Sequence, residues 1–163
     1  MSIQQALAIE IQRETENTIR ILKALPNEQF SYKPHPKSMS MGELANHIVE
    51  LHGWASMVFT VDEFDFHKDY TPSTLQTVDE LVAALEKMTE KNLEVVHSLT
   101  EEEYTKLWKL KAGDHVIVEA PRAGGYRFII TNHLIHHRGQ LTVYMRLLDI
   151  PLPGIYGPSA DEK

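Results

Sequence analysis

Two histidines, His133 and His137, are four residues apart in the segment NHLIHHRGQL. In a helix this spacing places two side chains on one face about one turn apart, where both imidazoles can bind one metal ion. The spacing matches the zinc-binding HExxH motif, but the residues between the histidines are Leu134, Ile135 and His136. The glutamate that serves that motif as general base is therefore missing. The segment predicts a pair of metal ligands, but not a metalloprotease.

The same histidine pair lies on the apolar face of the helix that this segment is expected to form. His133 and His137 are flanked at helical spacing by Ile130, Leu134, Leu141 and Met145. The pair should therefore point into the protein. His136 lies about 100° away from His137 around the helix and is expected at the boundary or the surface.

A third histidine, His47, occupies an equivalent position in an earlier segment. It follows Leu44 by three residues and precedes Ile48, so it lies on the apolar stripe of a second expected helix. Facing helices that each project ligands inward are how helical bundles build metal sites. A single inward histidine is more often a hydrogen-bonded core residue. Three buried imidazoles, however, cost several kcal/mol of desolvation unless each is satisfied, which favours a shared metal ion.

Other polar and aromatic residues carry weaker signals. His52 falls off the face of His47 and is expected to be solvated or at the boundary, and no partner is evident for His35, His67, His97 and His115. Thr18 and Asn92 lie on inward stripes and could line a pocket. Glu14 and Glu50 lie one turn from inward positions, where they could accept hydrogen bonds from metal ligands, although surface exposure is the expected outcome. Trp54 and Tyr144 are expected to pack in the core.

Four long segments with helical periodicity position these residues. They cover about residues 2–25, 40–58, 77–99 and 126–148. Two of them begin with a capping box, Ser40 with Glu43 and Thr77 with Glu80. Residues 62–74 are expected to form a loop, and residues 105–119 an extended segment or small hairpin. These elements predict an all-α four-helix bundle with long connections, at least one of them a crossover, in a single domain over residues 1–163.

Composition excludes several classes of protein. The 16 Lys and Arg residues against 23 Asp and Glu give 16 − 23 = −7, which disfavours a partner that is nucleic acid or an anionic membrane. The chain has no cysteine, so it contains no disulfide, no cysteine-based zinc site and no thiol nucleophile of its own. No apolar run reaches about 18 residues and the N-terminus lacks a signal sequence, which predicts no membrane span and a cytoplasmic location.

Two stretches resemble the DinB (damage-inducible, DinB/YfiT-like) family. They are SMGELANHIVELHGW and NHLIHHRGQLTVYMRLLDIPLPGIYGPSADE, and the resemblance is sharpest at HHRGQL and the Pro and Tyr-Gly residues that follow. The resemblance implies a metal triad of one histidine from the second long helix and two from the last, here His47, His133 and His137. Members of this family include metal-dependent transferases that use bacillithiol or mycothiol, and proteins without an assigned activity. The resemblance also implies a homodimer.

Three histidine ligands leave a four-coordinate metal ion one open position, which favours catalysis over a purely structural role. Zinc is the preferred ion for imidazole ligands, followed by nickel and then by iron or manganese. The expected nucleophile is a water or a thiolate at that position, acting on a small electrophilic substrate, so the chain would be a thiol S-transferase or a hydrolase. The alternatives are a non-catalytic metal-binding stress-response protein and a metal-free dimeric interaction domain. Residues 62–74 and 105–122 are the expected specificity elements.

Overall fold

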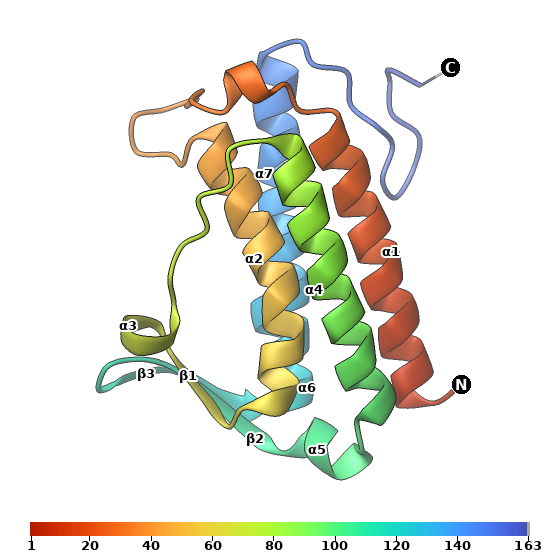
Figure 1. The fold of residues 1–163 in the computed structure, drawn as a ribbon, viewed down its shortest axis with the longest axis vertical. Helices are drawn as coiled ribbons and strands as arrows, with labels where there is room; N and C mark the ends of the chain where they lie inside the picture. The colour runs from red at the N-terminus through yellow and green to blue at the C-terminus, as the bar shows by residue number, and fades with distance from the viewer. Residues whose placement is uncertain (163) are drawn as a thin grey trace.

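The computed structural model describes residues 1–162, and long helices make up most of it. Figure 1 shows α1 (Ile3–Lys23), α2 (Met41–Thr60) and α4 (Val78–Ser98) side by side, with the last helical segment behind them. That segment is continuous from α6 (Arg122–Gly124) through the π-helix η2 (Gly125–Thr131) to α7 (Asn132–Leu147). Shorter elements lie in the connections, namely η1 (Asn27–Gln29), α3 (Phe66–Asp69) and α5 (Glu101–Thr105).

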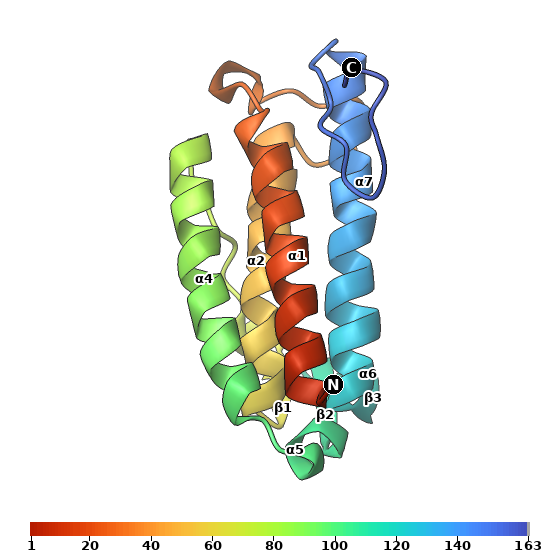
Figure 2. The ribbon, with the colours of Figure 1, turned by 90° about the vertical axis from the view of Figure 1, so that its right-hand side faces the viewer.

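The helices do not pack in chain order. α4 packs against both α1 and α2, and α7 packs against α2 and α1. Figure 2 shows α1 between α4 and α7, with α2 behind it. The chain from α2 to α4 runs back along the length of the helices, so α2 and α4 point in the same direction (Figure 1). The crossover connection predicted from the long linkers is therefore present.

Capping and apolar periodicity explain where the helices begin and what they bury. The hydroxyl of Ser40 accepts a hydrogen bond from the backbone N–H of Glu43 at 3.1 Å, and the Glu43 carboxylate accepts one from the N–H of Ser40 at 2.6 Å. Thr77 and Glu80 form the same pair of bonds at the start of α4. Both predicted capping boxes are thus confirmed. The predicted inward residues of α2 are all buried, namely Leu44, Ile48, Leu51, Ala55 and Val58.

A small sheet at one end of the helices corrects the all-α prediction. β2 (Leu107–Ala112) and β3 (His115–Pro121) form the expected antiparallel hairpin, and Gly113 in its turn has a φ of 61°, which glycine adopts without strain. β1 (Glu63–Asp65) adds to β2 in parallel, with Phe64 opposite Leu110. The expected loop over residues 62–74 therefore contains a strand and the short helix α3. A three-residue strand paired with chain more than forty residues away leaves no local periodicity to detect.

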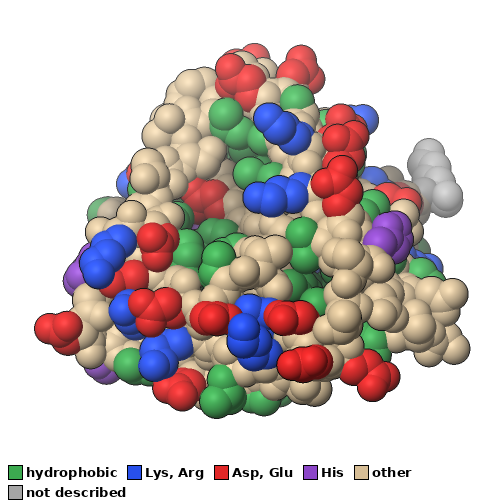
Figure 3. All heavy atoms as spheres, turned by 60° about the horizontal axis from the view of Figure 1, so that its bottom comes forward, with side chains coloured by type: hydrophobic (Ala, Val, Ile, Leu, Met, Phe, Trp, Pro, Cys, Tyr) green, Lys and Arg blue, Asp and Glu red, His purple; other side chains and the backbone are tan. Residues whose placement is uncertain are grey.

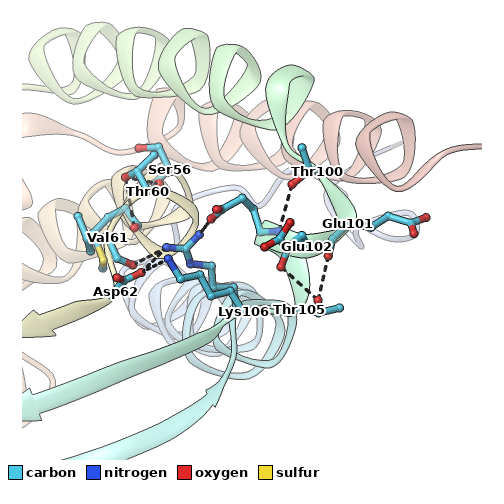
Figure 4. A network of polar contacts seen from close by, with 12 residues as sticks. Ser56, Thr60, Val61, Asp62, Thr100, Glu101, Glu102, Thr105 and Lys106 are labelled. Atoms are coloured by element: carbon cyan, nitrogen blue, oxygen red, sulfur yellow. Dashed lines mark hydrogen bonds and ion pairs between the residues drawn. The ribbon is translucent and has the colours of Figure 1, made fainter.

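The last helix begins at Arg122, four residues before the predicted start. Gly125 allows close packing here, because a Cβ atom on it would lie only 2.7 Å from the Trp108 ring. Buried Arg122 anchors this start: its guanidinium pairs with the carboxylates of Glu103 and Asp62. Figure 4 shows Asp62 and Lys106, which form an ion pair of 3.0 Å, among the polar contacts that join this end of the fold.

The surface of this end carries charges of both signs. Figure 3 shows acidic and basic side chains intermingled there, with apolar side chains between them. Within residues 1–162, no helix combines the length and the apolar character that crossing a membrane would need.

Candidate metal centre

Three histidines from two helices meet at one point. His47 projects from α2, and His133 and His137 project from α7, which packs against it. One ring nitrogen of each lies within 4.8 Å of the other two. The ring centroids of His47 are 5.2 Å from His133 and 4.8 Å from His137, and those of the α7 pair are 4.5 Å apart. The structure thus brings together the three residues that the sequence singled out as ligands.

Each of the three imidazoles has a hydrogen-bond acceptor at one ring nitrogen. Nδ1 of His47 lies 3.1 Å from Oε2 of Glu50, and Nδ1 of His137 lies 2.7 Å from Oε1 of Gln140. The carbonyl of Ile129 hydrogen-bonds the His133 ring. This bond must involve Nδ1, because Nε2 of His133 faces His137. Acceptors at Nδ1 hold the proton there and leave all three Nε2 lone pairs available.

The free Nε2 atoms form a donor set that fits a divalent ion. Nε2 of His133 and Nε2 of His137 are 2.7 Å apart. At this distance either one nitrogen carries a proton and donates a hydrogen bond to the other, or both lone pairs face a shared cation. Imidazole nitrogens are the ligands that zinc and nickel sites commonly use, and hydrogen bonding at the second ring nitrogen is typical of metal-bound histidine.

Burial keeps the α7 pair in the neutral form that binds metal. Desolvation, together with the nearby His137 and His47, lowers the pKa of His133 to about 4. Desolvation also lowers the pKa of His137, against the opposing effect of its hydrogen bond to Gln140. At neutral pH, protons therefore compete weakly for these two nitrogens.

Glu50 is buried beside His47 instead of being exposed. Burial tends to raise the pKa of its carboxyl, but hydrogen bonds from His47, the Ser73 backbone and Tyr70 outweigh it and hold the pKa below its ordinary value. The Tyr70 hydroxyl donates to Oε2 at 2.8 Å, and burial and this carboxylate raise the pKa of Tyr70 to about 12. The expected surface exposure of Glu50 was wrong, because the crossover chain that carries Tyr70 and Ser73 covers it.

His52 also differs from its prediction. It is 4% exposed, and its Nε2 lies 2.9 Å from the hydroxyl of Thr18. Burial and the charge of Arg138 lower the pKa of His52 to about 3. The expectation of a solvated or boundary residue failed because α2 packs against α4 on one side and α7 on the other, which leaves it little exposed face. Thr18 and Asn92 are buried around His52, and neither bonds to the histidine cluster.

Arg138 is a functional candidate that the sequence reasoning missed. It directly follows His137, is 3% exposed, and points away from the cluster toward α1. Its guanidinium binds the Glu14 carboxylate and the Thr18 hydroxyl of α1, and it contacts the Tyr156 hydroxyl. Glu14 is thus paired with Arg138 and does not accept from a histidine of the cluster. The C-terminal segment that carries Tyr156 returns along α7 in Figure 2. The arginine inside HHRGQL and the tail tyrosine were the available signals.

The remaining candidate residues differ in their position relative to the histidine cluster. Tyr144 is 9% exposed, packs edge-on against Tyr32 and donates to the carbonyl of Met39, so core packing describes it well. Trp54 is as buried, but its ring lies 6.1 Å from that of His47 and lines a surface hollow. The other histidines are exposed and lie outside the cluster, namely His35, His67, His97, His115 and His136.

Two hollows flank the cluster. One of about 430 Å³ is lined by His47, Glu50 and Tyr70, and its lining also includes Lys33 and Lys37. The second, of about 460 Å³, is mostly apolar and is lined by Trp54, Phe66, Leu110, Phe128, Ile129, Asn132, His133 and His136. Both connections that were expected to set specificity line these hollows. Residues 62–74 line both of them, and residues 105–122 line the second.

One family model, relatives from Bacillus subtilis and several solved structures match this chain. The family model described as DinB family matches residues 1–163. The uncharacterized protein YrdA of Bacillus subtilis is 24% identical over 157 residues, which cover 91% of this chain and 85% of that protein. Crystal structures of DinB-like proteins also match. The structure of YjoA from B. subtilis has a TM-score of 0.71 and 21% identity, and the match covers 94% of this chain and 99% of that chain. The structure of a Bacillus cereus protein has a TM-score of 0.70 and 24% identity, and the match covers 93% of this chain and 97% of that chain. At these identities the structures show a shared fold.

Proposed function

The chain belongs to the DinB family, and from this premise we propose that it is a metal-dependent thiol S-transferase. In this proposal His47, His133 and His137 hold one divalent ion, with zinc preferred over nickel, iron or manganese. A low-molecular-weight thiol and a small electrophilic substrate are the reactants. We also propose that the protein is a cytoplasmic homodimer whose long helices form a single DinB/YfiT-like four-helix-bundle domain.

The observation that carries the proposal is the set of three Nε2 atoms, each on an imidazole whose Nδ1 has its own acceptor. Three protein ligands are typical of catalytic zinc sites, which keep a fourth position for a reactant, whereas structural sites use four. An ion held there would supply positive charge that lowers the pKa of a thiol or a water bound to it, and so favours a nucleophile at neutral pH.

The chain's own residues favour a thiol as the reactant. Neutral imidazoles leave the full charge of the ion uncompensated, and the site lies half-buried between α2 and α7, where attraction for an anion is less screened than in water. No cysteine in the chain competes for the position. The hollow beside His47 holds Lys33 and Lys37 as well as Glu43 and Glu50, and Lys33 pairs with Glu43 at 3.3 Å, so Lys37 is the cation proposed to meet an anionic thiol.

Hydrogen bonding outside the triad prepares the site for this reaction. Glu50 orients His47, and Tyr70 and the Ser73 backbone in turn fix Glu50. Gln140 orients His137 through a bond within one turn of α7. These contacts hold the rings in place before a ligand arrives, which reduces the cost of assembling the reactive geometry.

Cobalt substitution tests the proposal. Cobalt-loaded protein is titrated with cysteine and with 2-mercaptoethanol while the near-ultraviolet spectrum is recorded. We expect a sulfur-to-cobalt charge-transfer band that saturates at one thiol per chain and is absent with metal-free protein. If no thiol changes the spectrum although water exchange at cobalt is measurable, the transferase assignment fails and hydrolysis takes its place. If neither thiol nor water reaches the ion, the metal is structural and the protein is non-catalytic.

A further inference from the structure

We propose that the hollow beside His133 binds the uncharged, apolar portion of the electrophilic substrate, with an aromatic or similarly flat group as the best fit. This inference rests on the proposed function, because it names the substrate class for the same centre. The hollow has a volume of about 460 Å³, a size typical of pockets that enclose small organic ligands.

Four elements that are distant in sequence build the apolar wall. Trp54 comes from α2, Phe66 from α3, Leu110 from β2, and Phe128 and Ile129 from η2. In Figure 1, α3 and the sheet lie at the lower end of α2, and they supply the part of the wall that the long helices alone would lack. The short helix α3, which the sequence prediction missed, therefore helps to form this surface together with the expected strand β2.

Contacts between aromatic rings keep this wall in place. The ring of Trp54 lies 5.5 Å from Phe66, 5.6 Å from Phe64 and 5.8 Å from Tyr70, measured between centroids. Phe66 and Phe64 are in turn 5.5 Å apart and nearly perpendicular. Edge-to-face pairs at these distances are favourable and restrict ring motion. The flat faces that a ligand would contact are thus set before it binds.

Charge distinguishes this hollow from the one beside His47. Its lining contains no Asp, Glu, Lys or Arg, and its polar groups are Asn132, His133 and His136. An ionised ligand would lose hydration here without gaining a side chain of opposite charge in the lining, so the wall itself favours a neutral ligand. The hollow beside His47 is lined by Lys33, Lys37, Glu43 and Glu50 and suits a polar, charged reactant.

The two hollows meet at the histidine cluster. His47 lines one and His133 lines the other, and their ring centroids are 5.2 Å apart. A thiol entering past His47 and an apolar electrophile entering past Trp54 would therefore reach the same point from different sides.

Phe128 gives the proposal a side chain that can be tested safely. It lines the hollow but is 69% exposed, so a ligand would cover it, and its removal should not disturb the core. Val143 is a matched control, because it is an exposed apolar residue of α7 that does not line the hollow.

The test measures binding of 2-naphthalenemethanol and of 2-naphthoate to metal-free protein by isothermal titration calorimetry, with no thiol present, so that the carboxylate cannot bind an ion at the cluster. We expect one site per chain for the neutral alcohol and binding of the carboxylate that is about tenfold weaker or more. Phe128→Ala should weaken binding of the alcohol about fivefold or more, whereas Val143→Ala should leave it unchanged.

Equal or tighter binding of the carboxylate, or an unaffected Phe128→Ala variant, would overturn the proposal. Sedimentation of the same variants tests whether a second copy of the chain occupies this face instead. A Phe128→Ala variant that dissociates from dimer to monomer while it binds the alcohol normally would assign the face to that copy. The calorimetry uses no thiol, so a negative result in it does not affect the cobalt test of the proposed transferase. A negative cobalt titration likewise does not affect the test of the apolar hollow.

Discussion

Nδ1 of His47 lies 3.1 Å from Oε2 of Glu50, one turn further along α2. This contact fixes which nitrogen of His47 faces the cluster, and it joins the centre to the crossover chain through Tyr70 and Ser73. The same helix therefore supplies both a candidate ligand and the group that orients it.

Removal of any one of the three imidazoles should release the metal. His47→Ala, His133→Ala and His137→Ala should each lose most bound zinc, because two imidazoles hold an ion far more weakly than three. Zinc content after dialysis, measured by elemental analysis of protein purified without a nickel column, checks this.

His136→Ala is the matched control and should keep a full equivalent of zinc, since His136 is exposed and lies outside the cluster. A variant set in which His136→Ala loses zinc and His137→Ala retains it would mean that the wrong face of α7 was assigned. His52 is unsuitable as a control, because it is buried in the core.

Glu50→Gln should weaken zinc binding without abolishing it. Loss of the negative charge makes His47 a poorer ligand, and changes of this kind typically cost about 10- to 100-fold in metal affinity. Competition with a chromophoric chelator measures the effect, and Glu86→Gln on the exposed face of α4 is the control. Equal affinities for the wild type and Glu50→Gln would show that this contact does not support a ligand.

The zinc affinity should begin to fall at a lower pH than the affinity of a site built from histidines with ordinary pKa values. Protons and zinc compete for the same nitrogens, and an unperturbed histidine has a pKa of about 6.5. The pKa of His133 is lowered to about 4 and that of His137 is also lowered, so both stay neutral below pH 6.5. The part of the loss that comes from protonation of His133 should therefore appear only as the pH approaches 4. Affinity that is unchanged down to pH 4 would exclude an all-histidine site.

His52 should make the fold less stable in acid. Its pKa of about 3 in the folded chain is below the value of about 6.5 in the unfolded chain, so the unfolded chain binds more protons between these values. Stability is fully present above pH 6.5 and is lost as the pH falls toward 3. From pH 7 to 5 this one group should remove about 2 kcal/mol from the free energy of unfolding.

Urea unfolding at a series of pH values measures this loss. His52→Gln, which keeps a polar group near Thr18, should show a smaller decrease between pH 7 and 5, whereas His115→Gln in β3 should match the wild type. A His52→Gln variant with an unchanged pH dependence would disprove the assignment.

Sequence periodicity was sufficient to locate the long helices and the cluster because both depend on local spacing. His133 and His137 share a face through one helical turn, and His47 lies on a stripe of buried leucine and isoleucine. Capping at Ser40 and Thr77 likewise involves residues three apart.

Features that depend on distant partners could not be predicted in this way. β1 exists because it pairs with β2, and Glu50 is buried because the crossover chain covers it. Burial of His52 follows from the packing of α2 against two helices, and Arg138 can be buried only because Glu14 of α1 compensates its charge. None of these partners is within helical reach in the sequence.

A crystal structure of zinc-loaded protein, with anomalous data collected at the zinc edge, tests the central claim most directly. We predict one anomalous peak per chain, about 2.0–2.1 Å from Nε2 of each of His47, His133 and His137, with a fourth ligand that is not a protein atom. A peak elsewhere, or zinc bound at this cluster by a fourth side chain that closes the site, would contradict the account.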